Sequence, residues 1–279
     1  MIQKKISLKL SSIVPLLLTA LLALVFFFPI ILMLTGSFKT NADIFDLSLG
    51  LLPRKPTLEN YRSVFEMMPF WRYAGNSLWV AGMNVIGTTI CTPMIAYSLS
   101  KIKWRGRDLI FSIITACMMI PYTVTMIPLY KIWTKVHLVG TFWPLIIPAF
   151  LGGPFYIIVL RQFMLSIPDE LIEAAEIDGC GRLKCFIRII FPLSRPGIAT
   201  IAIFSFMNAF SDFLGPLLYA NDAEHYTISI GLHAFIGQHS VNWGGMMAAA
   251  ALFMVPIMIV FMFFQRYLID GISTSGLKG

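Results

Sequence analysis

The sequence predicts an all-α membrane protein with six transmembrane helices. The 279-residue chain is 57% hydrophobic and only 13% charged, and its mean hydropathy is +0.78. A soluble globular chain carries about 25% charged residues. The net charge of +7 would suggest a nucleic-acid partner in a soluble protein. Here, however, the Lys and Arg residues lie between apolar segments, which is the pattern of membrane topology.

Six segments are long and apolar enough to cross a bilayer, which takes about 20 residues. The first follows Lys4, Lys5 and Lys9 and superficially resembles a signal peptide, but it is longer than one and ends without a small-residue cleavage site. We therefore expect residues 1–279 to form one transmembrane domain. Asp212 is the only Asp, Glu, Lys, Arg or His within the six spans. The spans are placed at about 13–36, 77–99, 110–130, 141–160, 197–219 and 244–264.

The distribution of Lys and Arg places both termini in the cytoplasm. With this orientation, 14 of the 21 basic residues lie inside and seven lie outside. The short segment Lys101–Arg107, with four basic residues, contributes most to the assignment. The polar segment 165–196 is then cytoplasmic. The longest outside loop, about 37–76, is expected to hold a short helix that follows Pro53 and is capped by Thr57.

The cysteines and histidines do not indicate a metal or redox site. Cys180 and Cys185 are not at CxxC spacing, and no Cys or His pair accompanies them. His225, His233 and His239 are spaced so that they do not share one helical face. We expect them to be ordinary surface residues.

The segment 165–196 is unlike the rest of the chain, because it holds five of the 14 acidic residues. Ser166 as a cap, Pro168 in the first turn and Asp169 near the positive end of the dipole predict a helix start. That helix is expected to stop near Gly179, a residue suited to the position after a helix C-cap.

A second short helix is predicted after Gly179. Its apolar residues fall at i, i+3, i+4 and i+7 and predict one buried stripe, formed by Leu183, Phe186, Ile187 and Ile190. Two short helices would thus meet at a glycine elbow. Ala174 and Ala175 would form a low patch, flanked by Glu173 and Asp178, which can accept charge-assisted hydrogen bonds. These residues leave two interpretations open: an ordinary amphipathic loop, or a docking site for another protein.

The spacing within this segment resembles the EAA signature of ABC importer permeases. Glu173-Ala174-Ala175 is followed by three residues, Gly179, nine residues and Ile189–Pro192, with Phe191 where the signature has Leu. Other segments resemble the maltose-type carbohydrate-uptake permeases: Asn76-Ser77, Ala96–Leu99, Ile120-Pro121, Ile127–Tyr130, Ser166–Pro168 and the tail from Gln265.

This resemblance implies the type I ABC importer permease fold and a function in ATP-driven sugar import. The chain would form half of a translocation pathway in the cytoplasmic membrane of a bacterium or archaeon. Its partners would be a second, related permease, two ATP-binding subunits and an extracytoplasmic solute-binding protein that delivers a carbohydrate. The residues implied in docking to an ATP-binding subunit are Glu173, Ala174, Ala175, Asp178 and Gly179.

The chain itself is expected to be neither an enzyme nor a cofactor-binding protein. It contains no GxxxxGK[ST] phosphate-binding loop. ATP and Mg²⁺ would therefore bind on the partner subunit.

Asp212 is the strongest candidate for the translocation pathway, because an ionisable residue within a membrane span usually faces a cavity or the bundle interior. Asn208 and Tyr122 are weaker candidates. The segment around Asp212 resembles the family pattern W-N-[DE]-x-L-W-P-L, but Phe210 and Gly215 replace its two Trp residues. That change either weakens sugar stacking or leaves a roomier cavity for a larger ligand. Alternatively, Asp212 pairs with a backbone amide or a partner subunit at a kink.

Two other functions remain possible from the residues. A secondary transporter or channel would not need ATP, but it would usually carry several acids within its spans, and this chain has one. A membrane scaffold without transport activity is the third hypothesis. ATP-dependent uptake that requires this chain would exclude both.

Overall fold

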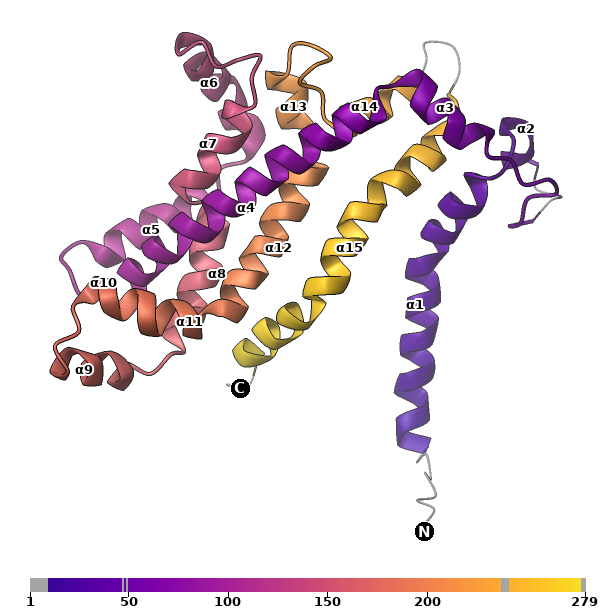
Figure 1. Ribbon diagram of the computed structural model, residues 1–279. Coiled ribbons are helices and arrows are strands. Elements are labelled where there is room, and N and C mark those ends of the chain that lie inside the picture. Colours follow the sequence, from indigo (N-terminus) through magenta and orange to yellow (C-terminus); the bar gives the residue numbers. More distant parts are fainter. Residues whose placement is uncertain (1–9, 47, 49, 237–240, 277–279) are drawn as a thin grey trace. The chain divides into compact units, whose positions relative to one another are not determined.

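The computed structural model describes residues 10–46, 48, 50–236 and 241–276, without the side chains of 10–12, 234 and 266–276. The three N-terminal lysines, His239 and the last three residues of the tail lie outside these ranges. The described chain is helical, with one isolated bridge between Ile236 and Val241. Its helices (Figure 1) are α1 (Leu10–Gly36), α2 (Asn41–Ile44), α3 (Glu59–Met67), α4 (Phe70–Ser100), α5 (Arg107–Cys117), α6 (Tyr122–Lys135), α7 (Trp143–Leu151), α8 (Pro154–Leu165), α9 (Glu170–Ile177), α10 (Arg182–Cys185), a π-helical turn (Phe186–Ile190), α11 (Phe191–Leu193), α12 (Arg195–Ser211), α13 (Leu214–Tyr219), α14 (Ile228–Gly231), a 3₁₀ turn (Leu232–Phe235) and α15 (Trp243–Gly276).

Among the residues that the structure describes, four helices are long and apolar enough to cross a membrane, and the number rises to six if each of two bent pairs is one span. The four are Ile13–Gly36, Phe70–Ser100, Trp143–Leu165 and Trp243–Gln265. The bent pairs are Arg107–Cys117 with Tyr122–Lys135, at 101°, and Arg182–Leu193 with Arg195–Ser211, at 75°.

The structure interrupts three of the expected spans. In residues 141–160, α7 ends at Leu151 and α8 begins at Pro154. Residues 110–130 are not one helix, because α5 ends at Cys117 and α6 begins at Tyr122 after Pro121. Proline lacks an N–H and disfavours helical backbone in the residue before it, which explains the break. Residues 197–219 are also interrupted, since α12 ends at Ser211 and α13 begins at Leu214.

The chain forms two compact units. One unit contains the residues up to Met68 together with 234–254, and the other contains 69–233 together with the residues from Val255 onward. Each unit is held by its own buried contacts.

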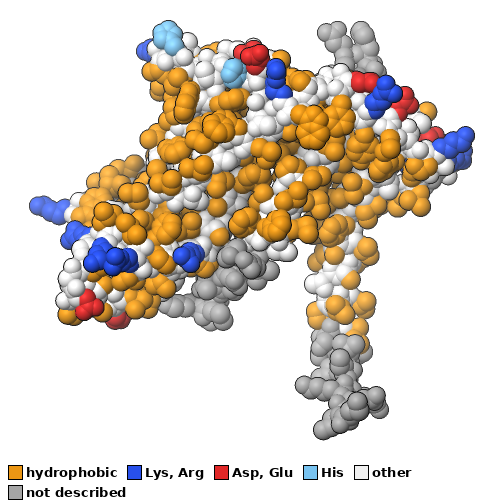
Figure 2. Space-filling model, in the orientation of Figure 1, with side chains coloured by type: hydrophobic (Ala, Val, Ile, Leu, Met, Phe, Trp, Pro, Cys, Tyr) orange, Lys and Arg blue, Asp and Glu red, His pale blue; other side chains and the backbone are white. Residues whose placement is uncertain are grey.

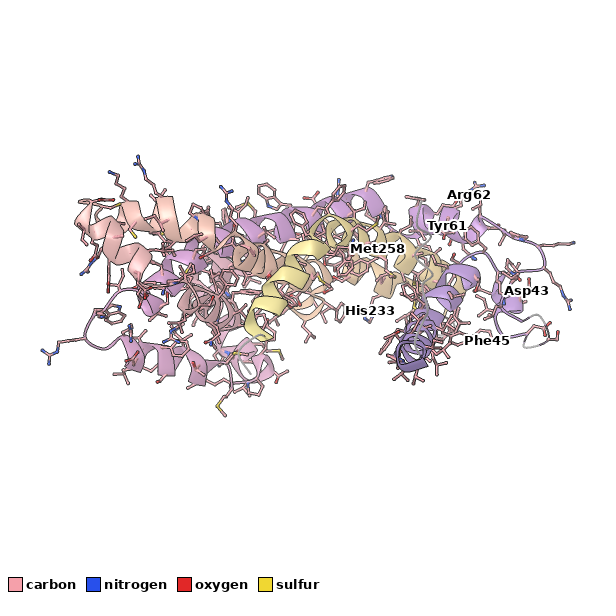
Figure 3. All side chains as sticks on the ribbon, turned by 90° about the horizontal axis from the view of Figure 1, so that it is seen from below. Asp43, Phe45, Tyr61, Arg62, His233 and Met258 are labelled. Carbon is pink, nitrogen blue, oxygen red and sulfur yellow. The ribbon has the colours of Figure 1, made fainter. Side chains whose placement is uncertain are left out.

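In the first unit, the buried side chain of Asn60 holds the chain that leaves α1. Its Nδ2 donates to the carbonyl oxygens of Ser37 and Lys39, at 2.8 and 2.7 Å. The Ser37 hydroxyl also bonds to Tyr61, at 2.9 Å (Figure 3). Gly244 approaches so closely that a Cβ there would lie 2.5 Å from Asn60 Oδ1.

The same unit is closed by a pair of asparagines. Asn41 Nδ2 donates to Asn242 Oδ1 at 3.0 Å, and Asn41 Oδ1 accepts from the Gly244 amide at 2.9 Å. Beside them Phe45, labelled in Figure 3, packs edge-on against Trp243 with ring centroids 6.0 Å apart. The predicted helix after Pro53 is α3. Its N-cap residue is Leu58 and not Thr57 as predicted, although Thr57 Oγ1 accepts from the Glu59 amide at 3.1 Å.

In the second unit, α4 is the central helix and packs against α7, α8 and α12 (Figure 1). Within the apolar contacts, the Thr88 and Ser205 hydroxyls bond to each other at 3.1 Å. Asn84 Nδ2 donates to the Leu145 carbonyl at 3.0 Å. Polar groups in a membrane interior must be satisfied by the protein itself, and these pairs do so between helices.

We expect Asn60→Ala to destabilise the first unit. The substitution leaves two buried carbonyl groups without their donor, and each such loss costs about 1–3 kcal/mol. Glu66→Ala on the same helix is the control, because it removes only an exposed ion pair with Arg62 and should cost less than about 1 kcal/mol. The measurement is thermal unfolding of the detergent-purified protein. Equal midpoints for the two variants would contradict the assigned role of Asn60.

Candidate functional site: the elbow at Gly179 and the exposed face of α12

The elbow turns at Gly179, as the sequence predicts. Gly179 has φ +77° and follows Asp178, the C-cap of α9. The Gly179 amide donates to the Glu176 carbonyl at 3.0 Å, and the Cys180 amide donates to the Ala175 carbonyl at 2.8 Å. This is the Schellman arrangement, in which a residue with left-handed backbone ends a helix and satisfies its last carbonyls.

The prediction that Ser166 caps the start of α9 is wrong. Ser166 ends α8, and its hydroxyl donates back to the Phe163 carbonyl at 2.7 Å. Asp169 is the N-cap residue, but its side chain makes no capping bond. Its carboxylate instead accepts from Lys101 Nζ, at 2.5 Å. The Asp169 carboxylate is therefore engaged by a donor distant in the sequence and not by the amides of its own helix.

The second half of the elbow does not bury the predicted stripe. Phe186 and Ile190 are buried, but the Leu183 and Ile187 side chains are 65% and 56% exposed. The reason is the π-helical turn, in which the Phe191 amide donates to the Phe186 carbonyl five residues earlier. A wider turn changes which residues share a face, so a stripe counted at helical spacing fails.

The structure places the two alanines of the EAA segment differently. Ala174 is exposed, together with Glu173, Asp178 and Gly179. Ala175 is buried and packs in a core cluster with Cys185 and other residues of the second unit. The predicted flat patch therefore contains Ala174 and not Ala175.

The outer surface of the elbow is unusually apolar for a segment outside the long membrane spans. Ile177 is 87% exposed, and Leu183, Ile187 and Leu171 are exposed as well. Figure 2 also shows Lys and Arg side chains at the end of the molecule where α9 and α10 lie. Contiguous exposed apolar residues with a charged rim are typical of a protein interaction surface.

One face of the C-terminal half of α12 is exposed. It consists of residues at i, i+3, i+4 and i+7, namely Phe204, Met207, Asn208 and Ser211. Asn208 interacts with the Tyr156 hydroxyl on α8. Polar residues in a span are costly against lipid, so a face with Asn208 and Ser211 fits a partner subunit or a water-filled pathway better.

Asp212 lies at the break that follows α12. Its Oδ1 accepts from the Gly215 amide at 3.1 Å, which caps α13, and its carbonyl accepts from the Ser229 hydroxyl at 2.6 Å. A Cβ on Gly215 would collide with the Asp212 carboxylate and would lie 2.9 Å from Leu145 Cδ2. The idea that Gly215 leaves a roomier cavity is therefore wrong, because these groups already occupy the space.

The structure brings Tyr122 to the neighbourhood of Asp212, together with two tyrosines that sequence reasoning missed. The Tyr122 and Tyr219 hydroxyl groups lie close enough to interact, and both lie near the Asp212 carboxylate. Tyr130 stacks on Tyr219 with ring centroids 6.2 Å apart. Tyr122 is 44% exposed, whereas Tyr219 is buried. Nothing in the local sequence joins Tyr219 to α6; only the fold does.

A separate pocket of about 240 Å³ lies beside the start of α7. Trp79, Phe142 and Trp143 line it, and its Thr141 and His225 side chains are already engaged. Thr141 donates to a backbone carbonyl, and His225 bonds to Asp222 at 2.7 Å, which helps to hold the pKa of Asp222 below its usual range. It offers few groups for recognising a polar solute.

Comparison with known proteins places both sites within one family. Residues 89–274 match the family described as "Binding-protein-dependent transport system inner membrane component". The chain belongs to this family.

Similar proteins support that membership over nearly the full length. The arabinooligosaccharides transport system permease protein AraQ of Halalkalibacterium halodurans is 33% identical, over 93% of this chain and 94% of that protein. The trehalose/maltose transport system permease protein MalG of Thermococcus litoralis is 32% identical, with the same shares. A chain in the crystal structure of a bacterial ABC transporter involved in importing the acidic polysaccharide alginate superposes with a TM-score of 0.78, at 25% identity, over 91% of this chain and 95% of that one.

As a member of this family, the chain is the permease subunit of an ATP-driven importer and a multi-pass membrane protein. It works with ATP-binding subunits, which hydrolyse the ATP, and with a solute-binding protein. Among the residues that the structure describes, no group of three His, Cys, Asp or Glu side chains could hold a metal ion.

The elbow should depend on the backbone of Gly179 and not on the space around it. A Cβ on Gly179 or on Gly181 meets nothing within 4 Å, but only Gly179 has a positive φ. We expect Gly179→Ala to cost about 1–2 kcal/mol of elbow stability and Gly181→Ala to cost much less. Gly179→Asn should fall between them, because Asn tolerates left-handed backbone. Hydrogen exchange over residues 170–193 reports the effect, and equal protection in the two alanine variants would be evidence against the assigned turn.

Proposed function

We propose that this chain is one of two related permeases in a bacterial or archaeal carbohydrate importer. The second permease, two ATP-binding subunits carrying ATP and Mg²⁺, and an extracytoplasmic solute-binding protein would complete the transporter. The observation that carries the proposal is the elbow: a glycine-hinged pair of short helices with exposed apolar and acidic side chains. The acidic side chains on this surface are costly in lipid, which supports contact with a protein partner.

The relatives support a carbohydrate substrate. AraQ is named for arabinooligosaccharides and MalG for trehalose and maltose. The transporter of similar structure is described as importing a polysaccharide. These names differ in sugar but agree in chemical class, so the proposal stops at a carbohydrate.

The docking surface for an ATP-binding subunit would be the outer side of α9. Glu173 and Asp178 are exposed and would accept hydrogen bonds from basic groups of the partner. Ala174 between them has a small side chain, which would let the partner approach closely. Gly179 allows the chain to turn after α9. Ala175, on the buried side of α9, would pack this helix against the core cluster. This arrangement would put the elbow and both termini in the cytoplasm.

The pathway would run along the exposed face of α12, with the second permease on the other side. Asn208 on this face and Asp212 at its end would supply polar groups for hydroxyls, and Tyr122 would supply an aromatic face. Tyr130 and Tyr219 would hold Tyr122 in place by stacking and hydroxyl contact. Movement of the elbows by ATP-driven closure of the partner pair would open and close this path.

The proposed function is tested by uptake into proteoliposomes that contain the full transporter. We expect ATP-dependent accumulation of at least one labelled sugar from a panel of arabinooligosaccharides, trehalose and maltose, delivered by the solute-binding protein. Ala174→Trp should prevent co-purification of the ATP-binding subunits, because an indole ring cannot fit where the partner approaches an alanine. Arg105→Trp, on an exposed position of another loop proposed to be cytoplasmic, is the control and should co-purify normally.

Uptake by the isolated chain, driven by an ion gradient without ATP, would favour a secondary transporter instead. Unchanged co-purification of the Ala174→Trp variant would contradict the docking surface.

Substitutions at Asp212 separate a pathway role from the capping role. Asp212→Asn keeps an oxygen that can accept from the Gly215 amide, whereas Asp212→Ala does not. If the negative charge contacts the solute, Asn should raise the KM for uptake about as much as Ala, by roughly tenfold for one lost charged hydrogen bond. If Asp212 only caps α13, the Asp212→Asn variant should keep normal uptake and only the Asp212→Ala variant should lose it. Uptake kinetics at equal transporter content decide between the two outcomes.

A further inference from the structure

Lys101 follows the last residue of α4, and its charge is almost completely buried. The side chain is 2% exposed, yet no apolar contact can compensate a buried ammonium group. Its Nζ donates to the Ile167 carbonyl and to Asp169 Oδ1, both at 2.5 Å. Both acceptors belong to the segment that leads into α9. A lysine at the end of one helix thus fixes the beginning of another.

The charges also suit the two helix ends that they join. Lys101 lies at the C-terminal end of α4, where a cation is favoured by the helix dipole. Asp169 is the N-cap residue of α9, where an anion is favoured. The pair therefore binds α9 to α4 in one orientation, with each charge at the end that stabilises it.

Two apolar contacts also hold α9. Ala175 is its one buried residue, and the partly buried Ile172 packs against the same core cluster. The second half of the elbow has its own bond to α4, from the Tyr97 hydroxyl to the Arg182 carbonyl at 3.2 Å. Loss of Lys101 would thus loosen the start of α9 from α4 while leaving the second half of the elbow attached.

The cytoplasmic end of α4 is itself firmly held. Arg161 Nε on α8 donates to the Leu99 carbonyl at 3.1 Å, and its guanidinium lies 3.8 Å over the Phe111 ring of α5. Trp104 Nε1 donates to the Ser98 carbonyl at 3.1 Å. These donors satisfy carbonyls that have no partner at a helix end. A displacement of α9 would therefore be passed to a rigid junction of α4, α5 and α8.

The other end of α4 is bonded to the segment before α14. Asn76 Nδ2 donates to the carbonyls of Glu224 and Tyr226, at 2.7 and 2.9 Å. The Ser77 hydroxyl accepts from the Ile228 amide at 2.9 Å. A single 31-residue helix thus connects the elbow with the loop on the opposite side of the membrane.

We propose that Lys101, paired with Asp169, is a positioning residue that couples α9 to α4, so that movement imposed on the elbow reaches the far end of α4. The inference rests on the proposed function, since it needs an ATP-driven partner at the elbow. Lys101 touches neither solute nor nucleotide in this account. It acts only through the placement of α9.

The test is hydrogen exchange on the complete transporter, with and without ATP–Mg²⁺, using a hydrolysis-deficient ATP-binding subunit. In the unmodified complex, ATP should change exchange both in α9 and in residues 222–231. Lys101→Met should leave the change in α9 and reduce the change in 222–231 at least about fivefold. Asp169→Asn should also reduce the ATP-induced change in residues 222–231. Lys101→Arg, which keeps the charge and donors, should show the same change as the unmodified complex.

Lys103→Met is the matched control, because Lys103 is exposed and makes no side-chain hydrogen bond or ion pair with the described residues. It should respond as the unmodified complex does. A purely structural Lys101 would alter exchange in the nucleotide-free state but leave the ATP-induced difference in 222–231 intact, and that result would overturn the proposal. Absence of any ATP response in the unmodified complex would overturn the proposed function, and this inference with it.

Discussion

The Lys101 ammonium group, removed from water at the end of α4, has to be paired, and the groups that pair it are the Ile167 carbonyl and the Asp169 carboxylate. Leaving a buried charge without a partner is far more costly than any local preference of the chain. The placement of α9 follows from this requirement. So does the direction of the elbow, because the Gly179 turn then sets the second half of the elbow relative to α9.

Two surfaces of the second unit are left open by this packing. The elbow exposes acidic and apolar side chains, and α12 exposes Asn208 and Ser211 within a span. Both surfaces include polar side chains that are costly against lipid. In a family whose members act with ATP-binding subunits, the first is where force would enter. The second is where a solute would pass.

Features that depend on neighbouring residues could be predicted from the sequence, and features that depend on contacts between distant residues could not. Gly179 as a helix stop depends on its own backbone, so its role could be predicted. Ser166 failed as a cap because it ends α8 and α9 begins only at Glu170, with Asp169 as N-cap residue and Lys101, 68 residues away, bonded to its carboxylate. The apolar stripe failed because a π-helical turn changed the spacing.

The candidate pathway shows the same limit. Asp212 stood out because it is alone among apolar residues, and Tyr122 was proposed with it. Tyr130 and Tyr219 could not be found, since ordinary aromatic residues in apolar segments carry no signal until α6 and α13 are placed together. The role of Gly215 was likewise hidden, because it depends on the Asp212 carboxylate that fills its side-chain space.

The most direct test of this account is the distance between α9 and α4 as ATP binds. Spin labels would be placed at Ile177 and Ile90, both exposed, with the four native cysteines replaced. If the elbow and α4 move as one body, the distance in the assembled transporter should change by less than about 2 Å between the nucleotide-free and ATP-bound states. A clear shift, or a second population at another distance, would show that α9 moves independently and would contradict the account.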